Sequence, residues 1–156
     1  AAPVRKHQRI LGEIHRQISN FLVNKTCEVN IAPFDVRLPE RDEKDEHILN
    51  VVQPDISIIC DPTKLDEKGC RGCPDLIIEI ISPSTVQRDM IEKLHLYERF
   101  AVKEYWIVHP TDEIVMVYKL QDNKIYGRAE IYSSKNKIGV GLFPDLIIDM
   151  EAVFSA

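Results

Sequence analysis

The stretch 72–85 constrains the fold more than any other segment, because it places two carboxylates inside an otherwise apolar run. Its centre, 76–81, is short, rich in β-branched residues and preceded by Pro74, which is typical of a strand covered on both faces. Side chains alternate along a strand, so Asp75 and Glu79 are predicted to share one face. A central strand that carries acids predicts an unusual environment for them.

Burial of a carboxylate is costly unless a cation, a metal ion or hydrogen-bond donors compensate it. Glu79 is therefore either a paired structural acid or a metal ligand, and the spacing alone leaves both interpretations open. A second acid, Asp55, follows Pro54 and interrupts the apolar run 49–60, which is also predicted to be a strand. Two neighbouring core strands would then each contribute one carboxylate.

A helix predicted over 85–100 carries Lys93 in the middle of its apolar face. A lysine in that position must extend to solvent, pair with a buried acid or lose its proton. In the functional interpretation, this helix packs on the sheet and brings the ammonium to Asp55 and Glu79. The structural alternative is an ion pair with Asp89, one helical turn away. The apolar residues that share the face of Lys93 are Val86, Met90, Tyr97 and Phe100.

The remaining segments complete an α/β pattern, with a mixed β-sheet flanked by α-helices. Apolar residues recur at helical spacing over 5–23, and Glu13 lies at the edge of that stripe, where a solvated or interhelical role is favoured. The charged run 40–46 is typical of a solvated hairpin loop without a binding role. Further strands are predicted over 29–38, with Pro33 at an edge or bulge, and over 104–110, 113–120, 124–133 and 146–150.

Length and composition limit the classes of protein to consider. A chain of 156 residues that is 44% hydrophobic can build one globular core, so we expect a single domain over 1–156. The formal net charge of −5 argues against a simple nucleic-acid-binding module, because phosphate affinity depends mainly on Lys and Arg. It does not exclude a nuclease whose acidic site is bridged to its substrate by metal ions. No apolar run is long enough to cross a bilayer, and we expect no membrane association and a cytoplasmic location.

Four cysteines allow a zinc or disulfide interpretation, which we weigh against free thiols in a reducing cytosol. Cys70 and Cys73 have the spacing of a metal knuckle, and Cys60 is near enough in sequence to join them. Cys27 is isolated and has no nearby histidine. The cysteines are therefore predicted to be unligated free thiols, and a zinc-knuckle scaffold is the third functional hypothesis.

Together, these motifs resemble a known family. Pro54-Asp55 followed by Glu79 in the next strand is similar to the PD-(D/E)XK nuclease arrangement, although Ile81 occupies the position of the expected lysine. The longer pattern closely resembles the Uma-two family of restriction-endonuclease-like proteins, in which the lysine is moved to the following helix, here Lys93. The residues that carry this resemblance are 54–55, 73–85, Asp89, Lys93, Tyr97 and 102–108.

The resemblance implies a restriction-endonuclease-like fold and a Mg²⁺- or Mn²⁺-dependent endonuclease that acts on nucleic acid, with DNA the expected substrate. Asp55, Glu79 and the backbone carbonyl of Ile80 would hold the metal ion, and Lys93 would assist the attacking water. Asp75 would bind a second ion or position Lys93. The main alternative is a catalytically inactive binding module with the nuclease fold, and the oligomeric state is open, with a homodimer as one option.

Members of this family also tend to carry an upstream acidic hairpin that ends in a proline followed by a histidine, like Pro3 and His7 here. We therefore expect an upstream segment to complete the site. The second-tier candidates for the site are Asp75, Asp89, His7 and Glu13.

Overall fold

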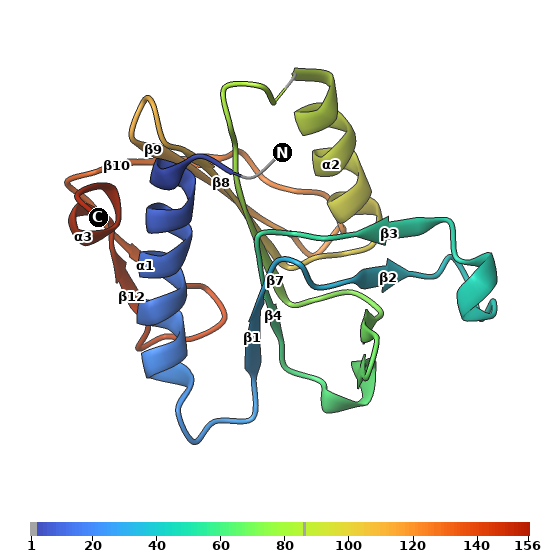
Figure 1. The fold of residues 1–156 in the computed structure, drawn as a ribbon. Coiled ribbons are helices and arrows are strands. Elements are labelled where there is room, and N and C mark those ends of the chain that lie inside the picture. Colours follow the sequence, from blue (N-terminus) through green and yellow to red (C-terminus); the bar gives the residue numbers. More distant parts are fainter. Residues whose placement is uncertain (1–2, 86) are drawn as a thin grey trace.

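The computed structural model describes residues 3–85 and 87–156, and its main feature is a six-stranded mixed sheet (Figure 1). The strands lie in the order β1-β4-β7-β8-β9-β10, in which β7 and β8 are parallel and the other neighbours are antiparallel. The strands are β1 (Glu28–Ile31), β4 (Ile56–Ile59), β7 (Leu76–Ile80), β8 (Glu104–His109), β9 (Ile114–Lys119) and β10 (Glu130–Ser133).

Helices cover the two faces of this sheet. They are α1 (Arg5–Leu22), α2 (Gln87–Arg99) and the short α3 (Met150–Phe154). The residues of α1 that point inward recur at spacings of three and four, and they pack with α3 against one face of the sheet. Figure 1 shows α2 on the other side of the sheet from α1. Tyr97 of α2 packs there in a second cluster with Ile77 of β7. The predicted α/β class with a mixed sheet between helices is confirmed.

A smaller sheet with the order β3-β2-β6-β5 extends beside the main one, and β11 pairs with β12. Their bounds are β2 (Val36–Leu38), β3 (Asn50–Val52), β5 (Leu65–Asp66), β6 (Gly69–Arg71), β11 (Lys137–Gly139) and β12 (Ile147–Asp149). Two single-turn 3₁₀ helices, η1 (Asp45–His47) and η2 (Pro62–Lys64), lie in the connecting segments.

The alternation predicted for β7 is confirmed by the two packing clusters. Leu76, Ile78 and Ile80 belong to the core beneath α1, whereas Ile77 packs in the cluster beneath α2. Glu79 has the parity of Ile77 and therefore points towards α2. All five residues of β7 are buried, as expected of a strand covered on both faces.

Two predicted strands were wrong in extent, because each divides at a proline. The segment 29–38 forms β1 and β2, which lie in different sheets on either side of Pro33. The segment 49–60 likewise forms β3 and β4 around Pro54. Proline has no backbone N–H to donate to a ladder, so each chain changes sheet there. The predicted strand 124–133 is ordered as a strand only over β10, and Val86 lies outside the described residues.

The prediction of four free thiols is also wrong, because Cys27 and Cys60 form a disulfide with a Cα–Cα distance of 4.0 Å. They adjoin the paired residues Glu28 and Ile59, so the β1–β4 ladder brings together two cysteines separated by 33 positions in sequence. Cys70 and Cys73 are free, and burial raises their pKa values to about 11 and about 12. With Cys60 in the disulfide, the proposed zinc knuckle loses a ligand, so that hypothesis is overturned.

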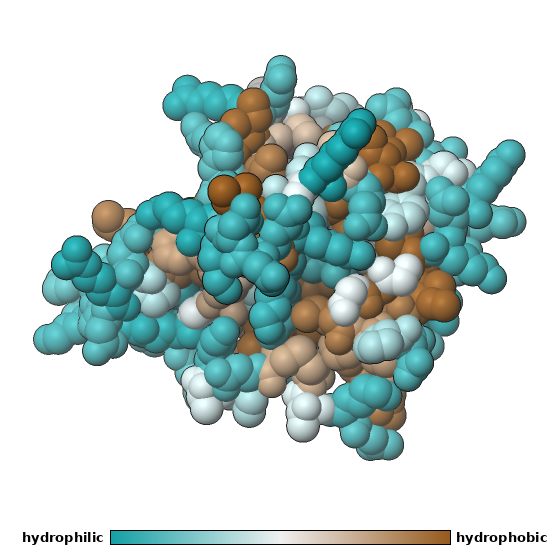
Figure 2. All heavy atoms as spheres, turned by 180° about the vertical axis from the view of Figure 1, so that it is seen from behind, coloured by the Kyte–Doolittle hydropathy of each residue, from teal (hydrophilic) through white to brown (hydrophobic). Residues whose placement is uncertain are grey.

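The charged run 40–46 joins β2 to β3, as predicted for a hairpin loop. Its acids also pair with basic residues of the smaller sheet, since Asp45 accepts hydrogen bonds from the guanidinium groups of Arg37 and Arg71 at 2.7 and 3.2 Å. Figure 2 shows the projecting end of the molecule around this hairpin covered mainly by hydrophilic side chains. Among the described residues, no helix is long and apolar enough to cross a membrane.

Candidate active site

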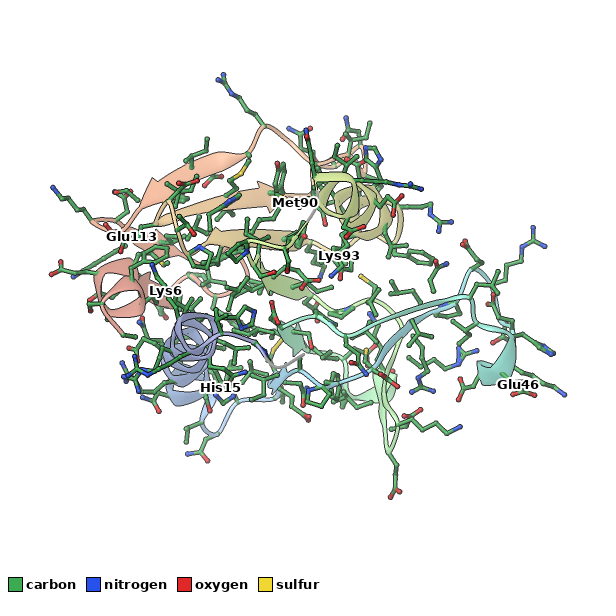
Figure 3. The ribbon with its side chains drawn as sticks, turned by 45° about the horizontal axis from the view of Figure 1, so that its top comes forward. Lys6, His15, Glu46, Met90, Lys93 and Glu113 are labelled. Carbon is green, nitrogen blue, oxygen red and sulfur yellow. A yellow bond between two sulfur atoms is a disulfide. The ribbon has the colours of Figure 1, made fainter. Side chains whose placement is uncertain are left out.

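Glu79 of β7 lies at the centre of a polar cluster beneath α2. Its Oε1 atom accepts hydrogen bonds from the Nζ of Lys93 at 3.1 Å and from the hydroxyl of Tyr97 at 2.8 Å. Lys93 and Tyr97 are four residues apart on α2 and therefore share the helix face that meets the sheet. The predicted approach of the Lys93 ammonium to Glu79 is confirmed, and Figure 3 shows Lys93 on the side of α2 that faces the sheet.

The electrostatics of the Glu79–Lys93 pair are asymmetric. The Glu79 side chain is 10% exposed, whereas that of Lys93 is 44% exposed, so the lysine extends from the interior towards solvent. Burial raises the pKa of the Glu79 carboxyl above its ordinary value, and the Asp55 charge adds to this effect, while Lys93 and the Tyr97 hydrogen bond oppose it. A cation near Glu79 therefore stabilises its ionised form.

Asp55 immediately precedes β4, the antiparallel neighbour of β7. Extending the register by one residue beyond the pair Ile56–Ile78 sets Asp55 opposite Glu79. Its Oδ2 atom accepts a hydrogen bond from the backbone N–H of Ile80 at 2.7 Å. This bond links the residue before β4 to the last residue of β7. The two acids were predicted on adjacent strands; Glu79 lies in β7, whereas Asp55 lies one residue before its neighbour β4.

His7 of α1 approaches the same carboxylate from the opposite side of the sheet. Its Nε2 atom lies 3.4 Å from Oδ2 of Asp55, and its Nδ1 atom is buried without a hydrogen-bond partner among the described residues. The first turn of α1 thus places the candidate residue His7 beside Asp55.

Two cavities meet at Glu79 and Lys93. One, of about 600 Å³, is lined by residues from the start of α1, the end of β7 and the segment before β4, among them His7 and Asp55. The other, of about 580 Å³, lies between β7, β8 and the first turns of α2. Glu79, Ile80, Ser84 and Lys93 line both of them. Pockets of this size are within the usual range for ligand sites.

The donor set suits a hard divalent cation. Among the hydrogen bonds of the described residues, Oδ1 of Asp55 and Oε2 of Glu79 accept none, so each acid keeps one oxygen for a ligand bond. No group of three or more His, Cys, Asp or Glu side chains within residues 3–85 and 87–156 could enclose a metal ion. Two carboxylates with water and substrate oxygens are typical of Mg²⁺, whereas a structural Zn²⁺ requires four protein ligands.

Two of the other second-tier candidates, Asp75 and Glu13, make their contacts away from this cluster. Asp75 lies at the far end of β7, about 13 Å from Glu79 along the strand at a rise of about 3.3 Å per residue. Its carboxylate accepts a hydrogen bond from the Cys60 N–H at 2.7 Å and lies 3.5 Å from the Lys103 ammonium. Asp75 is therefore not brought together with Lys93. Glu13 pairs with Arg16 on the exposed side of α1.

Asp89 lines the second cavity, but the ion pair that Lys93 forms among the described residues is with Glu79. The structural alternative of an Asp89–Lys93 pair is therefore not what the structure shows.

Two tyrosines of the site were not assigned roles from the sequence. Tyr97 was expected to be part of the apolar helix face, but its hydroxyl holds Glu79. Tyr105 of β8 lines the second cavity beside Glu79. The spacing of four between Lys93 and Tyr97 is the sequence signal that could have identified Tyr97. For Tyr105, the alternation of β8 gives the face of its side chain, but placing it near Glu79 also requires the β7–β8 register, which only the fold supplies.

The mixed sheet between helices, with acids on adjacent strands and a lysine on the following helix, defines a restriction-endonuclease-like fold. A crystal structure described as a "putative nuclease belonging to DUF820" from Anabaena variabilis superimposes with a TM-score of 0.77 at 20% identity, over 99% of this chain and 83% of that one. The sequence matches the Uma2 family, "Putative restriction endonuclease", over residues 1–151, and the chain belongs to that family.

A curated relative, the "Uncharacterized protein slr1290" from Synechocystis, is 24% identical over 120 residues. The match covers 76% of this chain and 60% of the relative, so the chain spans less than two thirds of that protein.

Proposed function

We propose that the protein is a Mg²⁺- or Mn²⁺-dependent endonuclease that hydrolyses phosphodiester bonds in nucleic acid, with DNA as the substrate. The observation that carries this proposal is the Glu79–Lys93 ion pair of 3.1 Å beside Asp55 on the adjacent strand. Membership of a family described as "Putative restriction endonuclease" supports this class of reaction, and the fold shared with a structure described as a "putative nuclease" is compatible with it.

In this proposal, Asp55, Glu79 and the backbone carbonyl of Ile80 hold the divalent cation. When bound, the cation would neutralise phosphate charge and increase the acidity of a coordinated water. The N–H of Ile80 donates to Oδ2 of Asp55, and Nε2 of His7 lies 3.4 Å from the same oxygen, so the carboxylate is positioned without the cation. The Tyr97 hydroxyl likewise positions the Glu79 carboxylate through its hydrogen bond.

Lys93 has the role of the lysine that is absent from position 81, where this chain has isoleucine. Because its side chain is 44% exposed and reaches the cavities from α2, its ammonium can contact a water or a phosphate oxygen as well as Glu79. It would orient the attacking water and stabilise the negative charge that develops on the phosphate. Its ion pair with Glu79 keeps the side chain directed at the reacting centre before substrate binds.

A cleavage assay tests the proposal. The protein, with its upstream segment included if the native chain has one, is incubated with plasmid, linear and single-stranded DNA and with RNA, in Mg²⁺, in Mn²⁺ and in EDTA. We expect metal-dependent cleavage that falls by at least about 100-fold in Asp55→Ala and in Glu79→Ala. Asp122→Ala, which removes an exposed acid distant from the cluster, is the control and retains full activity.

The principal alternative is an inactive module that keeps the fold and binds nucleic acid or protein. The departure at Ile81 from the PD-(D/E)XK pattern favours it. Binding of nucleic acid without cleavage in either metal, unchanged in Asp55→Ala, would support this alternative and contradict the nuclease.

A further inference from the structure

The cavity of about 580 Å³ beneath the first turns of α2 has features that phosphodiester cleavage does not require. It adjoins Glu79 and Lys93, but Asp55 and His7 do not line it. Its walls include the apolar side chains of Ile81, Met90 and Leu96, and Figure 3 shows Met90 on the side of α2 that faces the sheet. This partly apolar cavity, which Glu79 also lines, is positioned to take a part of the substrate next to the scissile phosphate.

Tyr105 contributes an uncharged hydroxyl to this cavity. Its side chain is 2% exposed, and its ring is held between Tyr97, at a centroid distance of 4.9 Å, and Tyr118, at 6.3 Å. Its hydroxyl makes no hydrogen bond to any described residue, yet it is not among the polar atoms that are sealed from solvent. Because Tyr105 lines the cavity and its hydroxyl has no partner among the described residues, this hydroxyl is available to a group bound in the cavity.

The charges around the cavity indicate which chemical group it suits. Glu79, Asp89 and Glu92 line it with three carboxylates against the single ammonium of Lys93. This excess of negative charge disfavours a phosphate but not an uncharged ring. Burial also raises the pKa of Tyr105, which keeps its hydroxyl protonated and able to donate a hydrogen bond.

We propose that this cavity receives one nucleobase of the substrate strand, beside the phosphate that is cleaved. Ile81, Met90 and Leu96 would contact the faces of the base, and the Tyr105 hydroxyl would bond to its edge, which is how proteins hold bases outside a stack. The base comes either from a single strand or from a nucleotide extruded from a duplex. This inference rests on the proposed function and identifies a subsite of the same site.

The first experiment measures base binding without catalysis. The four deoxynucleosides, which carry no phosphate, are added at millimolar concentration to the metal-free protein, and binding is followed by saturation-transfer NMR. We expect the wild type to bind at least one of them. Met90→Trp, which fills the cavity, should abolish the signal, and Tyr105→Phe should weaken binding about fivefold, as expected for one lost hydrogen bond.

Matched controls separate this effect from loss of folding. Ile91→Trp places the same ring on the next residue of α2, which is 46% exposed and does not line the cavity. Tyr118→Phe removes the hydroxyl of the neighbouring tyrosine, which also does not line it. Both should bind like the wild type. Circular dichroism checks the fold of each variant. If Met90→Trp does not fold, the comparison of Tyr105→Phe with Tyr118→Phe decides whether the cavity binds the base.

Failure of this inference can be distinguished from failure of the proposed function. Asp55→Ala should lose cleavage but keep nucleoside binding, because Asp55 does not line the cavity. Absence of binding to all four nucleosides, or equal binding by Tyr105→Phe and Tyr118→Phe, would overturn the nucleobase site even if the enzyme cuts DNA. Nucleoside binding by a protein that never cleaves would support the site and contradict the nuclease.

A second assay distinguishes the two sources of the base. Oligonucleotides with one 2-aminopurine, single-stranded or in a duplex, are bound to the protein, and the fluorescent base is moved along the strand. A fluorescence change restricted to the single strand assigns the base to single-stranded substrate. An increase at one position of the duplex assigns an extruded base. Cleavage of both forms without a change at any position would contradict the inference.

Discussion

The protonation state of Glu79 depends on residues from two elements. Burial of the carboxyl at the end of β7 raises its pKa, and Lys93 and Tyr97 of α2 supply donors that favour the charged form. Removing one of these partners leaves a buried acid that is less compensated, and such acids take up a proton instead of remaining charged. The availability of Glu79 as a ligand therefore depends on α2.

Lys93→Met tests this dependence, because methionine keeps an apolar stem and removes the charge. We expect the fold to be retained and metal-dependent cleavage to fall by at least about 100-fold, since both the water-orienting ammonium and the compensation of Glu79 are lost. Arg88→Met removes a positive charge from the exposed side of the same helix and is the matched control. Cleavage by Lys93→Met at the control rate would exclude Lys93 from the mechanism.

Glu104 of β8 is a second buried acid, far from the proposed chemistry. Its two oxygens accept hydrogen bonds from the indole N–H of Trp106 at 2.7 Å and from the N–H of Gly141 at 2.9 Å. Burial raises the pKa of Glu104 above its ordinary value of 4.5. The folded state therefore binds the proton more tightly than the unfolded state does. Its contribution to stability is fully present below pH 4.5 and is lost as the pH rises through the folded-state pKa.

Glu104→Gln should remove this pH dependence, because the amide does not titrate. We expect the free energy of unfolding of the wild type to decrease with rising pH in this window more steeply than that of the variant, by up to about 1.4 kcal/mol per pH unit. Urea unfolding at a series of pH values measures both slopes. Identical slopes would show that Glu104 does not titrate differently in the folded and unfolded states.

At the scale of the secondary-structure elements, alanine substitutions at two glycines are expected to change the stability of the protein in opposite directions. Gly69 begins β6 at a φ of +128°, and a Cβ there would lie 2.3 Å from the carbonyl oxygen of Asp35. Gly12 is exposed within α1, and a Cβ added there would meet no atom of the described residues within 4 Å. Gly69→Ala should therefore destabilise the protein by about 1–3 kcal/mol, and Gly12→Ala should stabilise it by about 0.5–1 kcal/mol. Chemical unfolding of the two variants checks the signs, and stabilisation by Gly69→Ala would contradict the β6 conformation.

The disulfide between β1 and β4 gives a second prediction for these elements. A thiol assay on the denatured protein should detect two thiols before reduction, those of Cys70 and Cys73, and four thiols after reduction. Reduction should lower the free energy of unfolding by about 2–4 kcal/mol, because the bond closes a loop between positions 33 apart. A result of four thiols before reduction would show that the two cysteines are neighbours without a bond.

The sequence predicted what depends on local periodicity. The alternation of β7 and the position of Lys93 on its helix were enough to predict that the lysine lies near Glu79 or Asp55, and it bonds to Glu79. The predictions that were wrong depend on contacts between distant segments. Residues 29–38 and 49–60 are each apolar enough for one strand. That each segment forms two strands becomes clear only from the sheets, because its two halves pack into different ones. The Cys27–Cys60 bond and the position of Tyr105 likewise require the strand order.

At the scale of the whole molecule, the main sheet separates two layers that both contribute to the site. The start of α1 reaches Asp55 from one face, and α2 reaches Glu79 from the other. The two cavities meet where these contributions join, at the ends of β4 and β7. With a net charge of −5, the protein carries little general attraction for phosphate, so we expect a bound cation to supply much of the local affinity for substrate.

Divalent-cation binding to the intact protein therefore shows whether Asp55 and Glu79 form a metal site. Titration calorimetry with Mg²⁺ and Mn²⁺, without nucleic acid, is carried out on the wild type, Asp55→Ala, Glu79→Ala and the control Asp122→Ala. We expect binding to the wild type and the control, and loss of binding in both site variants, because each removes one of the two carboxylates proposed to hold the ion. Wild-type affinity in Asp55→Ala and Glu79→Ala would contradict the proposed metal site.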